Sequence, residues 1–106
     1  MIRGSVWWVE FDPAVGSEIH KTRPAIIVSN DTANKFLARV VVIPLTSNVS
    51  RVYPGEAVVT VNDSKSKAMT DQIMSADKNR LKNKIAVLSD NDLVSLETAM
   101  KRFFDL

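Results

Sequence analysis

The sequence predicts a mainly β domain that ends in one helix, and three observations point to this fold class. Short runs of apolar, β-branched and aromatic residues recur between turn-forming residues over most of the chain. Near the C-terminus, the apolar residues recur at helical spacing instead. The chain has 106 residues, 45% of them hydrophobic and 25% charged, which suits one core but not two. We therefore expect a single domain spanning residues 1–106.

The first half of the chain contains three strand-like runs. Ser5–Phe11 (SVWWVEF) has apolar residues on both faces and should be covered on both. Its two tryptophans suit base stacking, but packing in the core or at an interface is their commoner use. The apolar run Ala25–Ser29 predicts a buried strand, and Ala33–Ala38 predicts a short helical turn. Arg39–Leu45 predicts the third strand, and Pro44, which lacks an N–H, should place its end at an edge or a bulge.

The second half of the chain predicts the remaining strands and the helix. Glu56–Val61 is the fourth predicted strand, Ala68–Ser75 is a fifth, and Ile85–Leu88 closes the sheet. Ser89 has capping-box spacing to Asp92 at the head of the C-terminal helix. The helix should lie on the sheet or on a partner through its apolar positions, which are Leu93, Leu96, Met100 and Phe103 or Phe104.

The composition excludes several kinds of site. The chain has no Cys and a single His, His20, so it has no disulfide, no thiolate nucleophile and no His-cluster or Cys-ligated metal. We expect no metal and no cofactor. A reducing cytoplasm suits a chain without Cys, no apolar run reaches the roughly 20 residues that span a membrane, and the first residues lack the apolar core of a signal peptide. The net charge of +2 permits nucleic acid as a partner without requiring it.

A polar segment, Gly16–Pro24 (GSEIHKTRP), joins the first two predicted strands. It combines a carboxylate, an imidazole, two cations and two hydroxyls. Pro24 disfavours the helical conformation at Arg23, so Arg23 should be extended at the start of a strand. Its guanidinium fork suits phosphate. A solvated polar loop without chemistry would have the same composition.

Two later segments also carry groups that suit phosphate. Thr46, Ser47 and Asn48 follow a buried strand directly, where they could bind phosphate oxygens or a leaving group, although the same residues favour a plain turn. Residues 65–84 are the most basic part of the chain and could form a phosphate-binding groove, although such runs are usually solvated faces. Asp71 would lie inside the predicted fifth strand, where a salt-bridged or outward-facing role and a functional role are equally open.

Taken together, these segments resemble the MazF/PemK/Kid family of toxins from bacterial type II toxin–antitoxin pairs. The matching pieces, in the family's order, are RGSVWWVEFDP, GSEIHKTRPAIIVSND, VVVIPLTS and TDQIMSADKNRL, followed by a helix. The resemblance implies a small SH3-like β-barrel with a C-terminal α-helix. It also implies a homodimer, an acidic MazE-like antitoxin, and metal-independent, sequence-specific cleavage of single-stranded RNA (mRNA) that inhibits translation and growth.

Catalytic roles come with the resemblance. Arg23 matches the family's catalytic arginine in the TRP motif, and Thr46 matches the catalytic threonine of the P-x-T-S motif. Glu18 matches a loop glutamate that some members need, and Asp71 matches the carboxylate general base of the Kid-like branch. That branch has an arginine two residues before the aspartate, where this chain has Met69, so its arrangement does not transfer whole. The arginine–threonine pair does transfer.

Residues expected to contact RNA lie in the same loop, in the turns after the third strand and in the basic stretch. They are Ser17, His20, Lys21, Thr22, Ser47, Asn48, Tyr53, Lys65, Lys67 and Gln72. The loop histidine of the Kid-like branch falls at Ser17 in this chain, whereas His20 lies three positions later.

The expected chemistry uses the 2′-hydroxyl of RNA as the nucleophile and gives a 2′,3′-cyclic phosphate and a free 5′-hydroxyl. Arg23 would stabilise the charge of the transition state, but an arginine is a poor proton acceptor. Glu18, His20 and Asp71 are therefore all candidates for the general base. Two other functions stay open, which are a toxin of this fold that binds a protein target such as DNA gyrase and a non-catalytic RNA-binding barrel.

Overall fold

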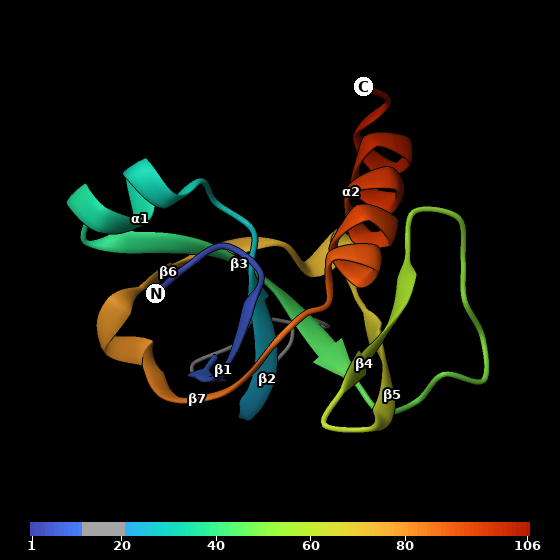
Figure 1. Ribbon diagram of the computed structural model, residues 1–106, viewed down its shortest axis with the longest axis horizontal. Coiled ribbons are helices and arrows are strands. Elements are labelled where there is room, and N and C mark those ends of the chain that lie inside the picture. The colour runs from blue at the N-terminus through green and yellow to red at the C-terminus, as the bar shows by residue number, and fades with distance from the viewer. Residues whose placement is uncertain (12–20) are drawn as a thin grey trace.

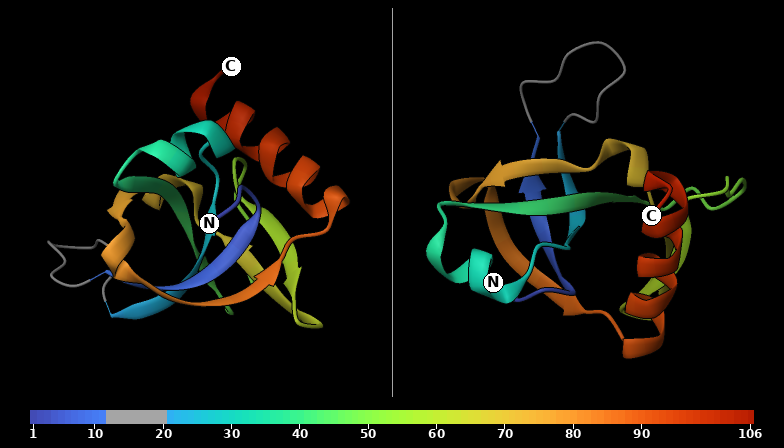
Figure 2. Two further views of the ribbon diagram at one scale, coloured as in Figure 1. Left: turned by 60° about the vertical axis from the view of Figure 1, so that its left-hand side comes forward. Right: turned by 90° about the horizontal axis from the view of Figure 1, so that it is seen from above.

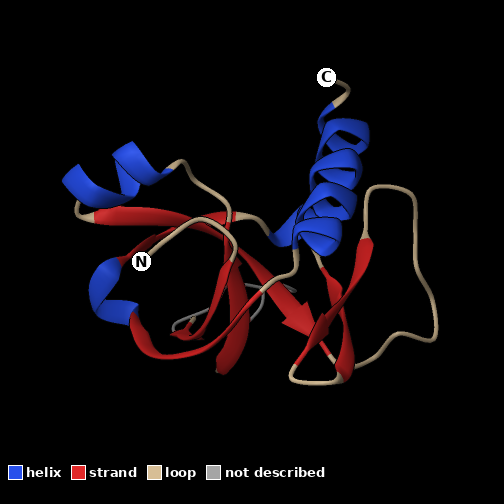
Figure 3. Cartoon of the chain, in the orientation of Figure 1, coloured by secondary structure: helices blue, strands red, loops and turns tan. Residues whose placement is uncertain are grey.

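The structure is a computed structural model, and it describes residues 1–11 and 21–106. The described part of the chain consists of strands with three short helical segments between some of them, and a long helix ends the chain (Figures 1 and 3). The elements are β1 (Ser5–Glu10), β2 (Thr22–Ile27), α1 (Asp31–Phe36), β3 (Arg39–Thr46), β4 (Ala57–Val61), β5 (Ser64–Ala68), η1 (Thr70–Gln72), β6 (Met74–Asp77), η2 (Lys78–Arg80), β7 (Leu81–Val87) and α2 (Asp90–Phe104), where η marks a 3₁₀ turn.

Within the described residues the strands form one seven-stranded sheet, in the order β4-β5-β3-β2-β1-β7, with β6 beside β3. All of these pairings are antiparallel. The sheet curls strongly on itself, and α2 stands at one end of it, against β4 (Figures 1 and 2). The predicted fold class, a small mainly β barrel-like fold with a C-terminal helix, is confirmed.

Strand β3 is the centre of the sheet because it has different neighbours along its length. One edge of β3 pairs with β2, while the other edge pairs first with β6 and then with β5. Pro44 lies between those two neighbours, and its carbonyl accepts the N–H of Met69 at 2.9 Å. The N and the carbonyl of one residue share an edge in an antiparallel strand, so the missing N–H of Pro44 faces the interruption. Pro44 was predicted to lie at a sheet edge or a bulge. It lies instead inside the sheet, beside a break between β6 and β5.

The prediction of one strand over Ala68–Ser75 was wrong. Strand β5 ends at Ala68, the chain makes the 3₁₀ turn η1, and β6 begins at Met74. Continuous pairing here would need the N–H that Pro44 lacks. Asp71 therefore lies exposed on η1 and not inside a strand.

Strand β1 contacts a core cluster on each face, as its composition predicted, although Trp8 and Glu10 on the face of Val6 are exposed. Val6 belongs to one core cluster with Ile26 and with Leu96 of α2, whereas Val9 belongs to a second cluster with Ile27. Residues 6 and 9 differ by an odd number of positions, so the pleat directs their side chains to opposite faces. The sheet is thus packed on both sides, which fixes β1, β2 and β3 rigidly behind the site described below.

Helix α2 begins and packs as the sequence predicted. The Ser89 hydroxyl accepts the N–H of Asp92 at 3.1 Å, and Leu96 and Ala99 are buried. The last turn is less covered, since Phe103 and Phe104 remain 44% and 43% exposed. Among the described residues, none of the helices is long and apolar enough to cross a membrane.

Candidate functional site

Strands β2 and β3 diverge at one end, and a pocket opens where their pairing stops. Their described ladder runs from Ile27 opposite Val42 to Ala25 opposite Pro44. Beyond that point β2 stays paired with β1, while β3 turns to β5. The same register, continued by two residues, would set position 23 against position 46.

The pocket between the diverging strands has a volume of about 250 Å³. It is lined by Trp8, Arg23, Pro24, Leu45, Thr46, Ser47 and Ser66. The two residues to which the family resemblance assigns catalysis therefore share one pocket, although 23 positions along the chain separate Arg23 from Thr46. Of the described residues that line it, one is a cation and none is a carboxylate, so this part of the lining suits an anion such as phosphate.

The β1–β2 ladder fixes the backbone of Arg23. Arg23 lies opposite Val9, which is fully buried, and Pro24 lies opposite Trp8. The predicted start of this strand at Ala25 would leave Arg23 just before it. Strand β2 begins at Thr22 instead, so Arg23 lies inside the strand. The half-buried side chain of Arg23 therefore starts from a rigid, extended backbone.

Thr46 is the last residue of β3, and its hydroxyl is part of the turn that follows. Thr46 Oγ1 accepts the N–H of Asn48 at 3.3 Å, and Asn48 Oδ1 in turn accepts the hydroxyl of Ser50 at 2.7 Å. Because Oγ1 acts as an acceptor in this bond, its own proton can be donated to a ligand. The segment is a turn, as its composition also allowed, and Thr46 and Ser47 nevertheless line the pocket.

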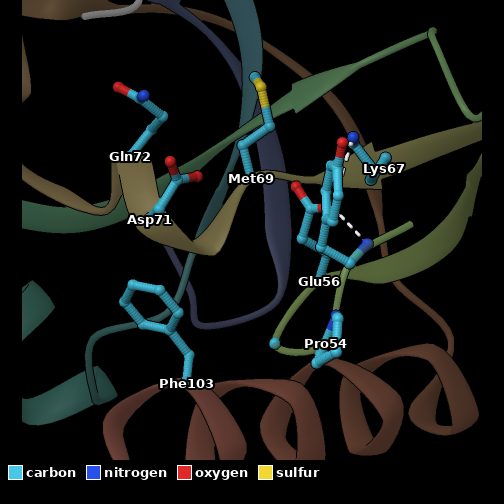
Figure 4. Close-up of a pocket in the computed structure, with 9 residues that line it drawn as sticks. Pro54, Glu56, Lys67, Met69, Asp71, Gln72 and Phe103 are labelled. Atoms are coloured by element: carbon cyan, nitrogen blue, oxygen red, sulfur yellow. Dashed lines mark hydrogen bonds and ion pairs between the residues drawn. The ribbon is translucent and has the colours of Figure 1, made fainter. Parts of the chain in front are cut away.

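A second pocket, of about 390 Å³, lies between η1, the turn before β4 and the end of α2 (Figure 4). Asp71 and three of the predicted RNA contacts line it, namely Tyr53, Lys67 and Gln72. The Asp71 carboxylate points towards the middle of this pocket, while the Gln72 amide points away from it (Figure 4). Asp71 is not among the residues that line the pocket of Arg23 and Thr46.

Lys67 is held in place by three groups. Its Nζ lies 3.4 Å from Oε1 of Glu56, donates to the carbonyl of Arg51 at 2.9 Å and lies 5.8 Å from the centroid of the Tyr53 ring. The side chains of Lys67 and Glu56 are each only 13% exposed. A phosphate would have to compete with this ion pair for Lys67, whose contact with RNA stays a prediction. Nothing in the sequence pattern predicted that Glu56 would form an ion pair with Lys67.

The other predicted contacts are spread over the surface around the two pockets. Lys21, Thr22, Ser47, Asn48 and Lys65 are all exposed. Ser17, Glu18 and His20 lie outside the described residues, so their predicted roles stay predictions. Among the described residues, no group of three or more His, Cys, Asp or Glu side chains gathers in a way that could hold a metal ion.

Sequence reasoning missed two residues of the small pocket, Trp8 and Ser66. Trp8 is 41% exposed, although the tryptophans of β1 were expected to serve mainly in packing. Alternation along a strand predicts that Trp7 and Trp8 face opposite ways, but not which of them reaches an open pocket. Ser66 reaches the pocket from β5, whose boundaries the sequence did not predict.

Comparisons with known proteins extend the match over almost the whole chain. Residues 2–104 match the family described as PemK-like, MazF-like toxin of type II toxin–antitoxin system. Endoribonuclease MazF9 of Mycobacterium tuberculosis is 38% identical, with 100% of this chain and 98% of that protein covered. Endoribonuclease MazF of Staphylococcus saprophyticus is 33% identical, with 94% of this chain and 88% of that protein covered.

Solved structures share the fold. MazF from Deinococcus radiodurans superimposes with a TM-score of 0.86 at 21% identity, covering 100% of this chain and 97% of that one. An endoribonuclease from a mycobacterial species, solved in complex with its cognate antitoxin, gives 0.84 at 22% identity, with 100% and 96% covered. The chain thus matches the curated relatives in sequence along its length and the solved structures in architecture. It belongs to the family of PemK-like, MazF-like toxins of type II toxin–antitoxin systems.

Proposed function

We propose that this chain is an endoribonuclease toxin that cleaves single-stranded RNA, including mRNA, at short sequences and so inhibits translation and growth. One observation carries the proposal, which is that Arg23 and Thr46 line a single pocket, whose described lining contains no carboxylate. The relatives named endoribonuclease, at 38% and 33% identity, support the same activity.

The proposed reaction needs little from the protein because RNA carries its own nucleophile. The 2′-hydroxyl gives up its proton as its oxygen attacks the adjacent phosphorus, and the bond to the 5′-oxygen breaks. The leaving 5′-oxygen takes up a proton from the protonated base or from water, so the products are a 2′,3′-cyclic phosphate and a 5′-hydroxyl. The Arg23 guanidinium would bind the non-bridging oxygens as their negative charge grows. The Thr46 hydroxyl would donate to the same phosphate and hold it in line for the attack.

The proton of the 2′-hydroxyl needs an acceptor, and this assignment stays open. Glu18, His20 and Asp71 are the candidates. Asp71 lines the neighbouring pocket. For Asp71 to act as the base, the RNA would have to extend across both pockets, or a second copy of the chain would have to bring its own Asp71 close to the small pocket. Separate substitution of the three residues, followed by measurement of the cleavage rate against pH, distinguishes them.

We further propose a homodimer in the cytoplasm, neutralised by an acidic, partly disordered antitoxin. The basic side chains around β5 and β7 would attract an acidic peptide, and a peptide laid across the small pocket would cover Arg23. The mycobacterial endoribonuclease solved with its cognate antitoxin supports a partner of this kind.

The test is incubation of the purified chain with a long single-stranded RNA, followed by mapping of the new ends. Cleavage at a recurring short sequence is expected, and Arg23→Ala should cleave about a hundredfold to a thousandfold more slowly. Arg39→Ala is the matched control because Arg39 is an exposed arginine at the opposite end of β3 and lines no part of the small pocket. Binding without cleavage would point to a non-catalytic RNA-binding barrel, and the absence of both would point to a protein target.

A further inference from the structure

The adjacent tryptophans of β1 have different surroundings. Trp7 is half-buried, packs against the core cluster of Val9 and Ile27, and donates its Nε1–H to the hydroxyl of Ser5 at 3.0 Å. Trp8 is 41% exposed and lines the small pocket with Arg23 and Thr46. Trp7 is therefore accounted for by packing, whereas Trp8 presents a large aromatic surface at the opening between the diverging strands.

The neighbours of Trp8 give the pocket the composition that a nucleotide needs. The indole offers a flat apolar surface, and the same pocket has a guanidinium and the hydroxyls of Thr46, Ser47 and Ser66 in its lining. Aromatic rings bind unpaired bases by stacking, while arginine and hydroxyl groups bind phosphate. At about 250 Å³ the pocket is smaller than the roughly 300–1,000 Å³ of sites for whole drug-sized ligands, so it would hold part of a strand and not a free ligand.

We propose that Trp8 is the stacking platform for the base of a nucleotide that flanks the scissile phosphate. This inference rests on the proposed ribonuclease function and adds a binding residue to it. Stacking tolerates any base because every base has a π-face. Trp8 therefore holds the strand in the pocket and positions the phosphate at Arg23 and Thr46, while discrimination between bases comes from other contacts.

A role for Trp8 in an apolar interface fits the pocket less well. Four of the residues that line the pocket beside it are polar, namely Arg23, Thr46, Ser47 and Ser66. The exposed aromatic residues Phe36, Phe103 and Phe104 lie outside this pocket. Trp8 thus lies in a different place from the exposed aromatic residues at the end of α2, where a protein interface is expected.

The first experiment measures cleavage of a short RNA by the full chain carrying Trp8→Ala or Trp8→Phe. Loss of one base–aromatic stack is expected to raise KM by about 5- to 150-fold in Trp8→Ala. Trp8→Phe keeps an aromatic face and should stay within a few-fold of the wild type. Phe36→Ala is the matched control because Phe36 is 74% exposed on α1, so its KM should not change.

The second experiment separates stacking from a structural role by removing the base itself. RNAs with an abasic nucleotide on either side of the scissile phosphate are compared with the intact RNA. In the wild type, one of the two abasic RNAs should raise KM as much as Trp8→Ala does. In Trp8→Ala, that abasic RNA should cause no further loss, because the stack is already absent.

The outcomes distinguish the inference from the function on which it rests. Equal penalties of the abasic RNAs in wild type and Trp8→Ala would overturn the stacking platform while leaving the ribonuclease intact. So would a Trp8→Ala variant with unchanged KM, or one whose loss is matched by a lower Tm or an altered sedimentation mass. A wild type that neither binds nor cleaves any RNA would overturn the proposed function and the platform together.

Discussion

Thr46 and Lys67 lie opposite each other across the β3–β5 ladder, and they line two different pockets. Thr46 lines the small pocket with Arg23, whereas Lys67 lines the larger one, where its Nζ lies 3.4 Å from Glu56. The described β3–β5 ladder is short, with Leu45 paired to Ala68 beside this pair. The contacts that hold Lys67 therefore also help to position its ladder partner Thr46.

The ion pair between Lys67 and Glu56 should stabilise the fold. Lys67→Met removes the cation and leaves the Glu56 carboxylate, 13% exposed, without its charged partner. We expect the free energy of unfolding to fall by about 1–3 kcal/mol in urea denaturation. The double variant Lys67→Met/Glu56→Leu should recover most of the loss because it leaves no unpaired charge.

Lys82→Met is the control for this pair. Lys82 lies 3.6 Å from Glu10, and both side chains are half exposed, so its removal should cost less than about 1 kcal/mol. If Lys67→Met proves as stable as Lys82→Met, the ion pair does not contribute to the stability of the fold.

Arg23 should be required for cleavage through the shape of its side chain as well as its charge. Arg23→Ala is expected to lower kcat by about a hundredfold to a thousandfold, the usual cost of one donor to a developing oxyanion. Arg23→Lys should lose less activity, because it keeps the charge but not the guanidinium fork. The Tm of both variants should stay close to that of the wild type, since the side chain is not part of either core cluster. Full activity in Arg23→Ala would refute the mechanism.

Thr46 should be required through its hydroxyl. Thr46→Ala is expected to lower kcat by a similar factor of about a hundred or more, whereas Thr46→Ser should be milder because it keeps the donor. Thr32→Ala, at an exposed position of α1, should leave the rate unchanged. Equal loss in Thr46→Ser and Thr46→Ala would show that the methyl group, and with it local packing, is what matters.

Regular strands were predictable because local pattern determines them. The runs of β1 and β3 are rich in β-branched and aromatic residues, and the structure places strands there within one residue of the predicted ends. The resemblance to the toxin family also supplied Arg23 and Thr46, and the family is confirmed. That these two residues share a pocket follows from the divergence of β2 and β3, which no local pattern encodes.

The errors have long-range causes. The break at Asp71 arises beside Pro44, a residue 27 positions earlier in the chain, because the strand next to β3 cannot bond to a missing N–H. The exposure of Trp8 depends in the same way on where the β2–β3 ladder stops. Local sequence patterns do not encode the strand register that places the break at Asp71 beside Pro44 and leaves Trp8 exposed.

The chain should form a homodimer whose interface includes the end of α2. Phe103 and Phe104 remain 44% and 43% exposed there, and aromatic residues of this kind are enriched in interfaces. Sedimentation at micromolar concentration should give twice the chain mass of 11.8 kDa. Phe104→Lys should shift the protein towards the monomer, whereas Phe36→Lys, on exposed α1, should not. A wild type that sediments only as a monomer contradicts the prediction.

Cleavage should depend on the 2′-hydroxyl and not on a metal ion. The chain has one His and no Cys, and its described residues contain no cluster of three or more metal-ligating side chains, so activity should survive EDTA. Replacing the nucleotide 5′ of the scissile phosphate by its 2′-deoxy form removes the attacking oxygen, so the cut at that site should stop while binding persists. A 2′-deoxy nucleotide one position further upstream is the control and should still allow cleavage. Mapped ends should carry a 2′,3′-cyclic phosphate and a 5′-hydroxyl. Loss of activity in EDTA that Mg²⁺ restores, or a cut in the 2′-deoxy RNA, would mean that water or a metal-bound group is the nucleophile instead.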